Sequence, residues 1–174
     1  MKSDIRQQDE KTMTMKKAII RMPMIALVFS TITLAAWQVH AETNRVQFPE
    51  LEGLVHYTTV RRGEVTEHIM TTPEALEAVK KGEPIPAGTY FVLVDYREGK
   101  VHRYFVMQNG PGWGNDYEER RRTGDWQFQW FWADKSINLR ENTTRCQSCH
   151  NSRSDENYLY TFDALKAFNG TVVE

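Results

Sequence analysis

The alternation of apolar and polar residues predicts two β-hairpins in the first part of the chain. Four runs are rich in β-branched and aromatic residues: Leu54 to Val60, Val65 to Thr71, Thr89 to Tyr96 and Val101 to Met107. Within each pair, the runs are separated by four residues that include a glycine, Arg61 to Glu64 and Arg97 to Lys100. Short strand-forming runs joined in this way are typical of antiparallel hairpins.

A further strand is predicted from Trp126 to Trp132, where large rings recur at every second position. The period of two places Trp126, Phe128, Trp130 and Trp132 on one face. We expect this face to cover the hydrophobic core rather than to form an aromatic binding box, because large rings are usually buried.

Short helices are expected around these strands. One is predicted from Pro73 to Val79, because Thr72 can cap its free N–H groups and proline suits the first helical position. Gly82 ends it. Two more are predicted near the C-terminus, one capped by Thr143-Thr144 and one from Phe162 to Phe168. The expected fold class is therefore mainly β (α+β), an antiparallel sheet with short helices.

Residues 1–41 have the layout of a secretory signal peptide. Basic residues precede an uncharged apolar run from Ile25 to Trp37, and cleavage is expected after Ala41. A membrane anchor between Met22 and Val39 is the alternative. Met15 is a second candidate start, so a mis-assigned start would explain the polar residues before it. Export predicts a periplasmic protein.

Residues 42–174 have the size of one domain, since removing 41 residues from 174 leaves 133. The net charge of −1 becomes −4, because the first 41 residues hold six of the 22 Lys and Arg and three of the 23 Asp and Glu. An acidic domain of this kind is not expected to bind nucleic acid, which attracts basic surfaces.

The segment Cys146-Gln147-Ser148-Cys149-His150 is the motif that carries chemistry. In C-x-x-C-H, two thiols add across the vinyl groups of haem and the adjacent histidine ligates the iron. We therefore predict one covalently bound haem c, with Cys146 and Cys149 as attachment residues and His150 as the axial iron ligand.

Two other uses of the cysteines are weaker alternatives. A zinc site needs two more ligands, and the remaining histidines of residues 42–174 show no paired ligand spacing. A thioredoxin-like dithiol normally lies near the start of a βαβ unit, whereas these cysteines lie near the end of a β-rich chain.

The sixth iron ligand decides whether a haem carries electrons or admits small molecules. The sequence leaves this ligand open. Residues that offer a suitable nitrogen or sulfur are His56, His68, His102, Met70 and Met107, and each also suits an ordinary strand position.

Several motifs together resemble the cytochrome P-460 family and its cytochrome c′-beta relatives. The resemblance runs from about Thr66 to Leu165 and includes, in order, Gly88-Thr89, Phe105-Val106-Met107, Gly112-Trp113-Gly114, Asp116-Tyr117, Gly124-Asp125-Trp126, the haem motif and Tyr158-Leu159-Tyr160-Thr161. It implies an antiparallel β fold, a homodimer in many members, and a five-coordinate haem whose open distal side faces small nitrogen species.

The resemblance also assigns residues to the distal pocket. Members with the P-460 chromophore oxidise hydroxylamine and carry a lysine cross-linked to the porphyrin, whereas the relatives without that link bind nitric oxide. The cross-link position falls on Leu93, and the position of a distal arginine falls on Glu67, beside His68. Leucine there would repel water and anions and admit a neutral diatomic molecule.

These residues favour a mono-haem protein that binds nitric oxide or a similar ligand, or that passes electrons. A hydroxylamine-oxidising enzyme is the rival, with Glu67 or His68 as proton acceptor and a partner cytochrome receiving the electrons. A six-coordinate electron carrier is the third hypothesis. No catalytic residue is assigned from the sequence.

Overall fold

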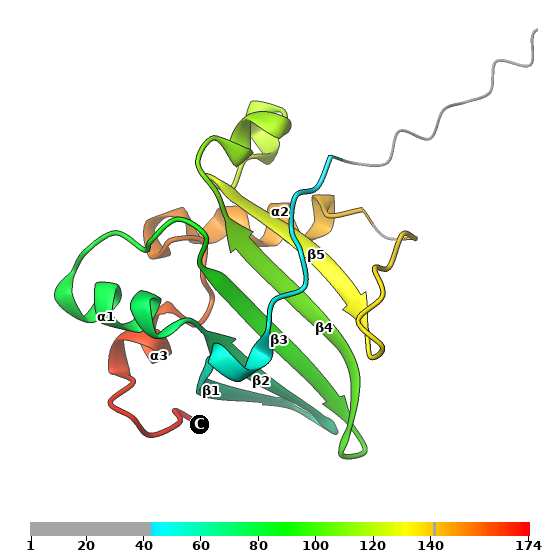
Figure 1. Ribbon diagram of the computed structural model, residues 1–174, viewed down its shortest axis with the longest axis vertical. Helices are drawn as coiled ribbons and strands as arrows, with labels where there is room; N and C mark the ends of the chain where they lie inside the picture. Colours follow the sequence, from blue (N-terminus) through cyan, green and yellow to red (C-terminus); the bar gives the residue numbers. More distant parts are fainter. Residues whose placement is uncertain (1–42, 141) are drawn as a thin grey trace, which may run out of the picture. The chain divides into compact units, whose positions relative to one another are not determined.

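A five-stranded antiparallel sheet forms the centre of the computed structural model, which describes residues 43–140 and 142–174 (Figure 1). The strands lie side by side in sequence order: β1 (Val55–Arg62), β2 (Val65–Thr71), β3 (Tyr90–Arg97), β4 (Lys100–Asn109) and β5 (Trp126–Trp132). Every neighbouring pair is antiparallel. The predicted mainly β class is confirmed.

The predicted signal peptide, residues 1–41, lies outside the described residues, as does the alternative anchor. All described residues belong to one compact unit. In that part of the chain, no helix has the length and apolar character needed to cross a membrane.

The two hairpins are present, but their turns are shorter than predicted. β1 and β2 are joined by Gly63-Glu64 alone, because Arg62 still pairs with Val65. β3 and β4 are joined by Glu98-Gly99, both with positive φ. Two positive φ angles match the type I′ turn, whose twist continues that of the strands and which glycine adopts without strain.

Within the described residues, three α-helices accompany the sheet: α1 (Pro73–Lys81), α2 (Thr144–His150) and α3 (Phe162–Ala167). As predicted, Thr72 caps α1, since its side chain accepts the N–H of Ala75 at 3.3 Å. The predicted cap of α2 by Thr143 is wrong, since its side chain makes no capping hydrogen bond; the side-chain oxygen of Asn142 accepts the N–H of Thr144 at 3.1 Å instead. Short 3₁₀ helices fill the connections: η1 (Leu51–Gly53), η2 (Trp113–Asp116), η3 (Glu119–Arg121) and η4 (Asn151–Glu156).

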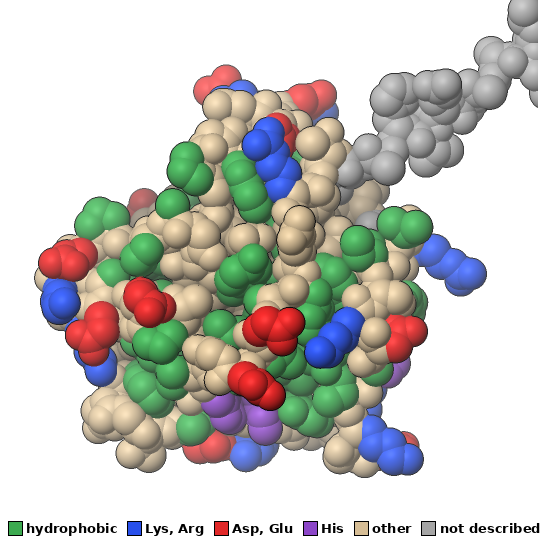
Figure 2. All heavy atoms as spheres, viewed as in Figure 1, with side chains coloured by type: hydrophobic (Ala, Val, Ile, Leu, Met, Phe, Trp, Pro, Cys, Tyr) green, Lys and Arg blue, Asp and Glu red, His purple; other side chains and the backbone are tan. Residues whose placement is uncertain are grey.

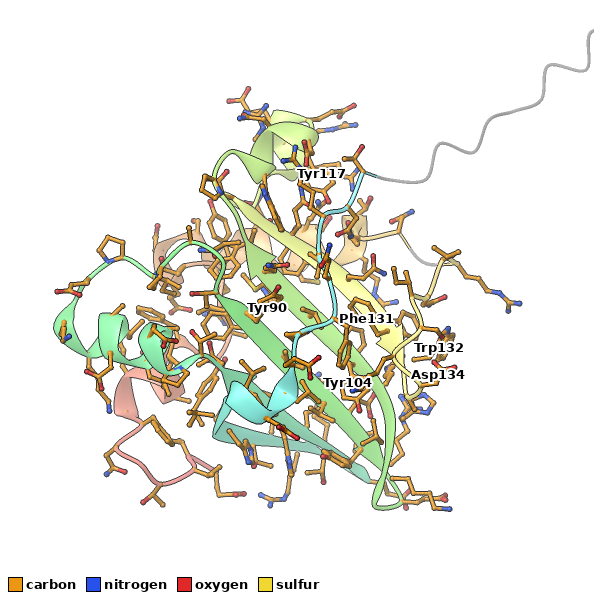
Figure 3. The ribbon with its side chains drawn as sticks, viewed as in Figure 1. Tyr90, Tyr104, Tyr117, Phe131, Trp132 and Asp134 are labelled. Carbon is orange, nitrogen blue, oxygen red and sulfur yellow. The ribbon has the colours of Figure 1, made fainter. Side chains whose placement is uncertain are left out.

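Both faces of the sheet are covered. One face packs under the C-terminal helices and contributes Ile69, Phe91 and Phe128 to the larger core cluster. The other face is crossed by residues 43–54, drawn in cyan in Figure 1, and Phe48 of this segment packs edge-on against Tyr104 and Phe131. Figure 3 shows these two rings on the face that the segment crosses.

The aromatic face of β5 covers the core over only part of its length. Trp126 and Phe128 are buried in the larger cluster, but Trp132 is 38% exposed. Phe131, which the period of two directs to the other side, is buried in the second cluster. The expectation that the four rings form one wall over the core is therefore wrong at the end of β5, because the sheet buries residues on both faces and its core side ends near Trp130.

Two of the motifs that mark the family resemblance form a single structural unit. The carboxylate of Asp125 accepts the N–H groups of Gly112 at 3.0 Å and Gly114 at 3.1 Å. Gly114 is buried and lies directly against the carbonyl oxygen of Gly124. The two glycine-containing motifs thus connect η2 to the start of β5.

Candidate functional site

Helix α2 carries the two cysteines and the histidine of the motif. Residues three and four positions apart lie on the same face of a helix, so Cys146, Cys149 and His150 project together. Between them, Gln147 is buried, and its side-chain oxygen accepts the Nε–H of Arg121 at 2.9 Å. This contact fixes the rotation of the short helix against the segment before β5.

These three side chains line a cavity of about 540 Å³, within the range of about 300–1,000 Å³ that is usual for ligand pockets. The rest of the wall comes from all five strands, from α2 and from the segment after η4: Tyr57, Val60, Arg62, Glu67, Ile69, Phe91, Leu93, Arg103, Phe105, Val106, Met107, Phe128, Gln129, Arg145, Leu159, Tyr160 and Thr161. The motif therefore opens onto the core face of the sheet.

The ring of His150 is held in one orientation. Its Nδ1 lies 2.5 Å from the carbonyl oxygen of Tyr158, which requires the proton on that nitrogen. The other nitrogen, Nε2, is then the acceptor that an iron needs, and a hydrogen bond of this kind also fixes the ring. The ring packs against Phe128, with centroids 4.8 Å apart. Burial lowers the pKa of His150, although the bond to Tyr158 opposes the shift, so the ligating neutral form is favoured.

Apolar side chains form much of the wall contributed by the strands. Ile69, Leu93 and Phe105 face the cavity from three neighbouring strands, and the pairing places Leu93 directly between the other two. Leu93 also packs on the larger core cluster. A ligand beside this wall meets carbon rather than hydrogen-bond donors.

Charged residues lie one row further along the same strands. Glu67 is 7% exposed and forms an ion pair with Arg62 at 3.2 Å. Asp95, which pairs in register with Glu67, accepts the Nε–H of Arg103 at 2.7 Å. Burial opposes ionisation of Asp95, but its hydrogen bonds to Arg97 and Arg103 outweigh that effect and lower its pKa.

The structure brings together only some of the residues singled out from the sequence. Leu93 and Glu67 line the same cavity as Cys146, Cys149 and His150. His68 does not, because strand alternation directs it to the other face, where it stacks on His56 with centroids 4.2 Å apart. Figure 2 shows histidine side chains at the surface on the face that residues 43–54 cross.

The candidates for a sixth ligand separate in the same way. Met107 lines the cavity, whereas His56, Met70 and His102 are absent from its wall. Met70 packs instead against the second core cluster. Among the described residues, no three or more His, Cys, Asp or Glu side chains lie close enough together to hold a metal ion. The zinc alternative therefore lacks a ligand set in this part of the chain.

The residues that line this cavity fit a haem group. Two thiols and one imidazole with an available nitrogen lie on one side, apolar side chains offer surface for a porphyrin, and charged donors are present for its two carboxylates. These donors are Arg62, Arg103 and Arg145, and guanidinium groups bind carboxylates in paired geometry.

Two contributors were missed by the reading of the sequence. Arg103 lies four residues before Met107 on β4, so the period of two predicts that it faces the core. The sequence did not show that Asp95 would be its partner. Its guanidinium stacks over Phe105 and Trp130, 4.8 and 4.7 Å from the ring centroids. Tyr158 accepts the hydrogen bond from His150 with its backbone carbonyl, and the side-chain pattern of a sequence does not reveal such a contact.

An antiparallel sheet whose core face opens onto a cavity lined by a C-x-x-C-H segment is the arrangement expected of a β-sheet haem protein. The profile of the family described as Cytochrome P460 matches residues 37–161, which is most of the chain, and the chain belongs to this family. Family membership implies a haem cofactor and confirms the predicted family resemblance. No curated protein matches the chain.

Proposed function

We propose that this chain is an exported c-type cytochrome with one covalently bound haem and an open distal site for small nitrogen species such as nitric oxide. The observation that carries the proposal is the cavity lined at once by Cys146, Cys149 and His150. The sequence contains one C-x-x-C-H segment, which supports a single haem. A haem iron held there would supply a coordination position for a small ligand.

The chain's own residues would have distinct tasks. Cys146 and Cys149 would tether the cofactor, and the carbonyl of Tyr158 would hold His150 in the tautomer that leaves Nε2 for iron. Arg103, kept in place by Asp95 and by stacking on Trp130, would bind a carboxylate of the cofactor.

The preference for a neutral diatomic ligand rests on the apolar wall. Ile69, Leu93 and Phe105 face the cavity, and the family resemblance implies that Leu93 falls at the position of the cross-linking lysine in the P-460 members. Side chains of this kind exclude water and do not stabilise anions. They favour nitric oxide over charged ligands and leave the porphyrin without a cross-link.

Hydroxylamine oxidation is the second candidate, and Glu67 favours it. This carboxylate lines the cavity, and burial raises its pKa while Arg62 opposes the shift. A carboxylate with a raised pKa is suited to accept protons from a bound substrate. Electrons would then leave to a partner cytochrome. The third candidate, a six-coordinate carrier, would use Met107.

Absorption spectroscopy of the purified ferrous protein distinguishes these candidates. We expect a high-spin spectrum without the red-shifted band of the P-460 chromophore, because Leu93 cannot form the cross-link. Rapid mixing should show tight binding of nitric oxide and little turnover of hydroxylamine. A shifted band or rapid turnover would overturn the preferred function.

The controls for this experiment use two variants. If hydroxylamine is oxidised, Glu67→Gln should slow the reaction by about 10²-fold or more, as expected for loss of a general base. If the spectrum is low-spin, Met107→Leu should convert it to high-spin, which would establish the electron carrier instead.

Export to the periplasm and assembly into a homodimer belong to the same proposal. Fractionation of cells that produce the full chain should recover haem-stained protein outside the cytoplasm and shortened at its N-terminus. Sedimentation of that protein gives the oligomeric state.

A further inference from the structure

Glu67 is a buried carboxylate whose bonding within the protein is incomplete. Its side chain lines the cavity and is 7% exposed as a residue. Oε2 makes no hydrogen bond to any described residue, and Arg62 approaches it at 3.2 Å only as an ion pair. A buried carboxylate oxygen without a donor is costly, so this site favours either a bound donor or a proton on the carboxyl group itself.

The surroundings of Glu67 set its charge balance. From β3, Asp95 lies opposite it in register and remains ionised because Arg97 and Arg103 hold it. Arg62 is the direct partner of Glu67, but 68% of its side chain is exposed, so solvent weakens the pair. Other titratable or charged groups that line the cavity are Arg145, Cys146, Cys149 and His150 on α2, Tyr57 on β1 and Tyr160 after η4.

We propose that Glu67 takes up a proton when a haem in this cavity is reduced, so that electron and proton enter together. The proposal rests on the haem site proposed above. A haem held in this cavity would take one electron from a one-electron donor such as a partner cytochrome, and one proton from solvent would convert the Glu67 carboxylate to a carboxylic acid. The net charge of the cavity is then unchanged.

Two charges of the cofactor act on Glu67 in the same direction. Reduction removes one positive charge from the iron, which lowers the attraction that keeps Glu67 ionised. The carboxylates of a bound haem would compete for Arg62 and Arg103, the cations whose field favours ionisation of Glu67. Burial of the Glu67 carboxylate keeps the effect of the iron charge weakly screened, whereas solvent already weakens the pair with Arg62.

The test is a redox titration of the purified haem-containing full chain at a series of pH values. The wild-type midpoint potential should fall by up to about 59 mV per pH unit between the pKa values of Glu67 in the ferric and ferrous states, and level off outside that range. Glu67→Gln keeps the shape but cannot titrate, so its potential should be higher at alkaline pH and nearly independent of pH. Glu64→Gln removes a neighbouring exposed charge outside the cavity wall and should retain the wild-type slope.

A second measurement detects the protonated carboxyl group directly. The infrared difference between reduced and oxidised wild-type protein should show a new carboxylic-acid C=O band, which Glu67→Gln removes. Arg62→Gln should move the pH range in which the midpoint potential falls to higher pH, because it takes away a cation that favours the ionised form of Glu67.

An unchanged slope of the midpoint potential against pH in Glu67→Gln would assign the proton to the cofactor's carboxylates or to another group and overturn the inference. Absence of haem from the purified protein would instead overturn the proposed function.

Discussion

Replacing both Cys146 and Cys149 by serine is expected to abolish covalent attachment of haem. Both cysteines line the cavity from one side of α2, and serine hydroxyls do not form the thioether bonds. Protein from the double variant should show no haem staining after denaturing electrophoresis. It should also melt at a lower temperature, because a cofactor that binds only the folded state stabilises that state.

Ser148→Ala is the matched control for this experiment. Ser148 lies between the two cysteines, is exposed and does not line the cavity. Its variant should retain the haem, and a variant with one cysteine replaced should retain a single thioether link. Covalent haem in the double variant would refute the assignment of Cys146 and Cys149 as attachment residues.

Replacing Gly114 by alanine is expected to destabilise the fold by about 3 kcal/mol, within the range of strong overpacking effects. A Cβ atom built at Gly114 overlaps the backbone carbonyl oxygen of Gly124, which cannot move like the end of a flexible side chain. The shift would also disturb the bonds from Gly112 and Gly114 to Asp125, which hold η2 against the start of β5. Urea unfolding followed by tryptophan fluorescence measures the change.

Gly53→Ala provides the comparison, since a Cβ there meets nothing within 4 Å and its φ is not positive. That variant should unfold within about 0.5 kcal/mol of the wild type, as surface substitutions usually do. If the two variants were equally stable, the close approach of Gly114 to Gly124 would have no energetic importance.

The fold was predictable where local physics decides it. Val65–Thr71 and Tyr90–Arg97 form strands because β-branched and aromatic residues suit a pleated surface, and the turn at Glu98-Gly99 needs two residues with positive φ. Thr72 with Pro73 marked the start of α1. The lengths of the two turns were misjudged, because charged residues such as Arg62 gave no sign that pairing continued through them.

The core pattern was predictable only in part. The alternation in β5 correctly placed Trp126 and Phe128 together, but it did not show that Phe131 would be buried on the opposite face. That burial depends on Phe48, which is distant along the chain and packs against Phe131 in space. The residues of a strand do not show which other segment of the chain will pack on it.

The amino-acid pattern was enough to identify the family and the sheet and to place Cys146, Cys149 and His150 on one helical face, because spacing along a helix is a local property. What those residues face depends on how the chain packs. The tertiary structure placed Glu67 and Leu93 on their cavity and His68 on the opposite side, since one step along a strand reverses the direction of a side chain. It also brought Arg103 and the Tyr158 carbonyl to the site, through contacts between segments that only the packed chain joins.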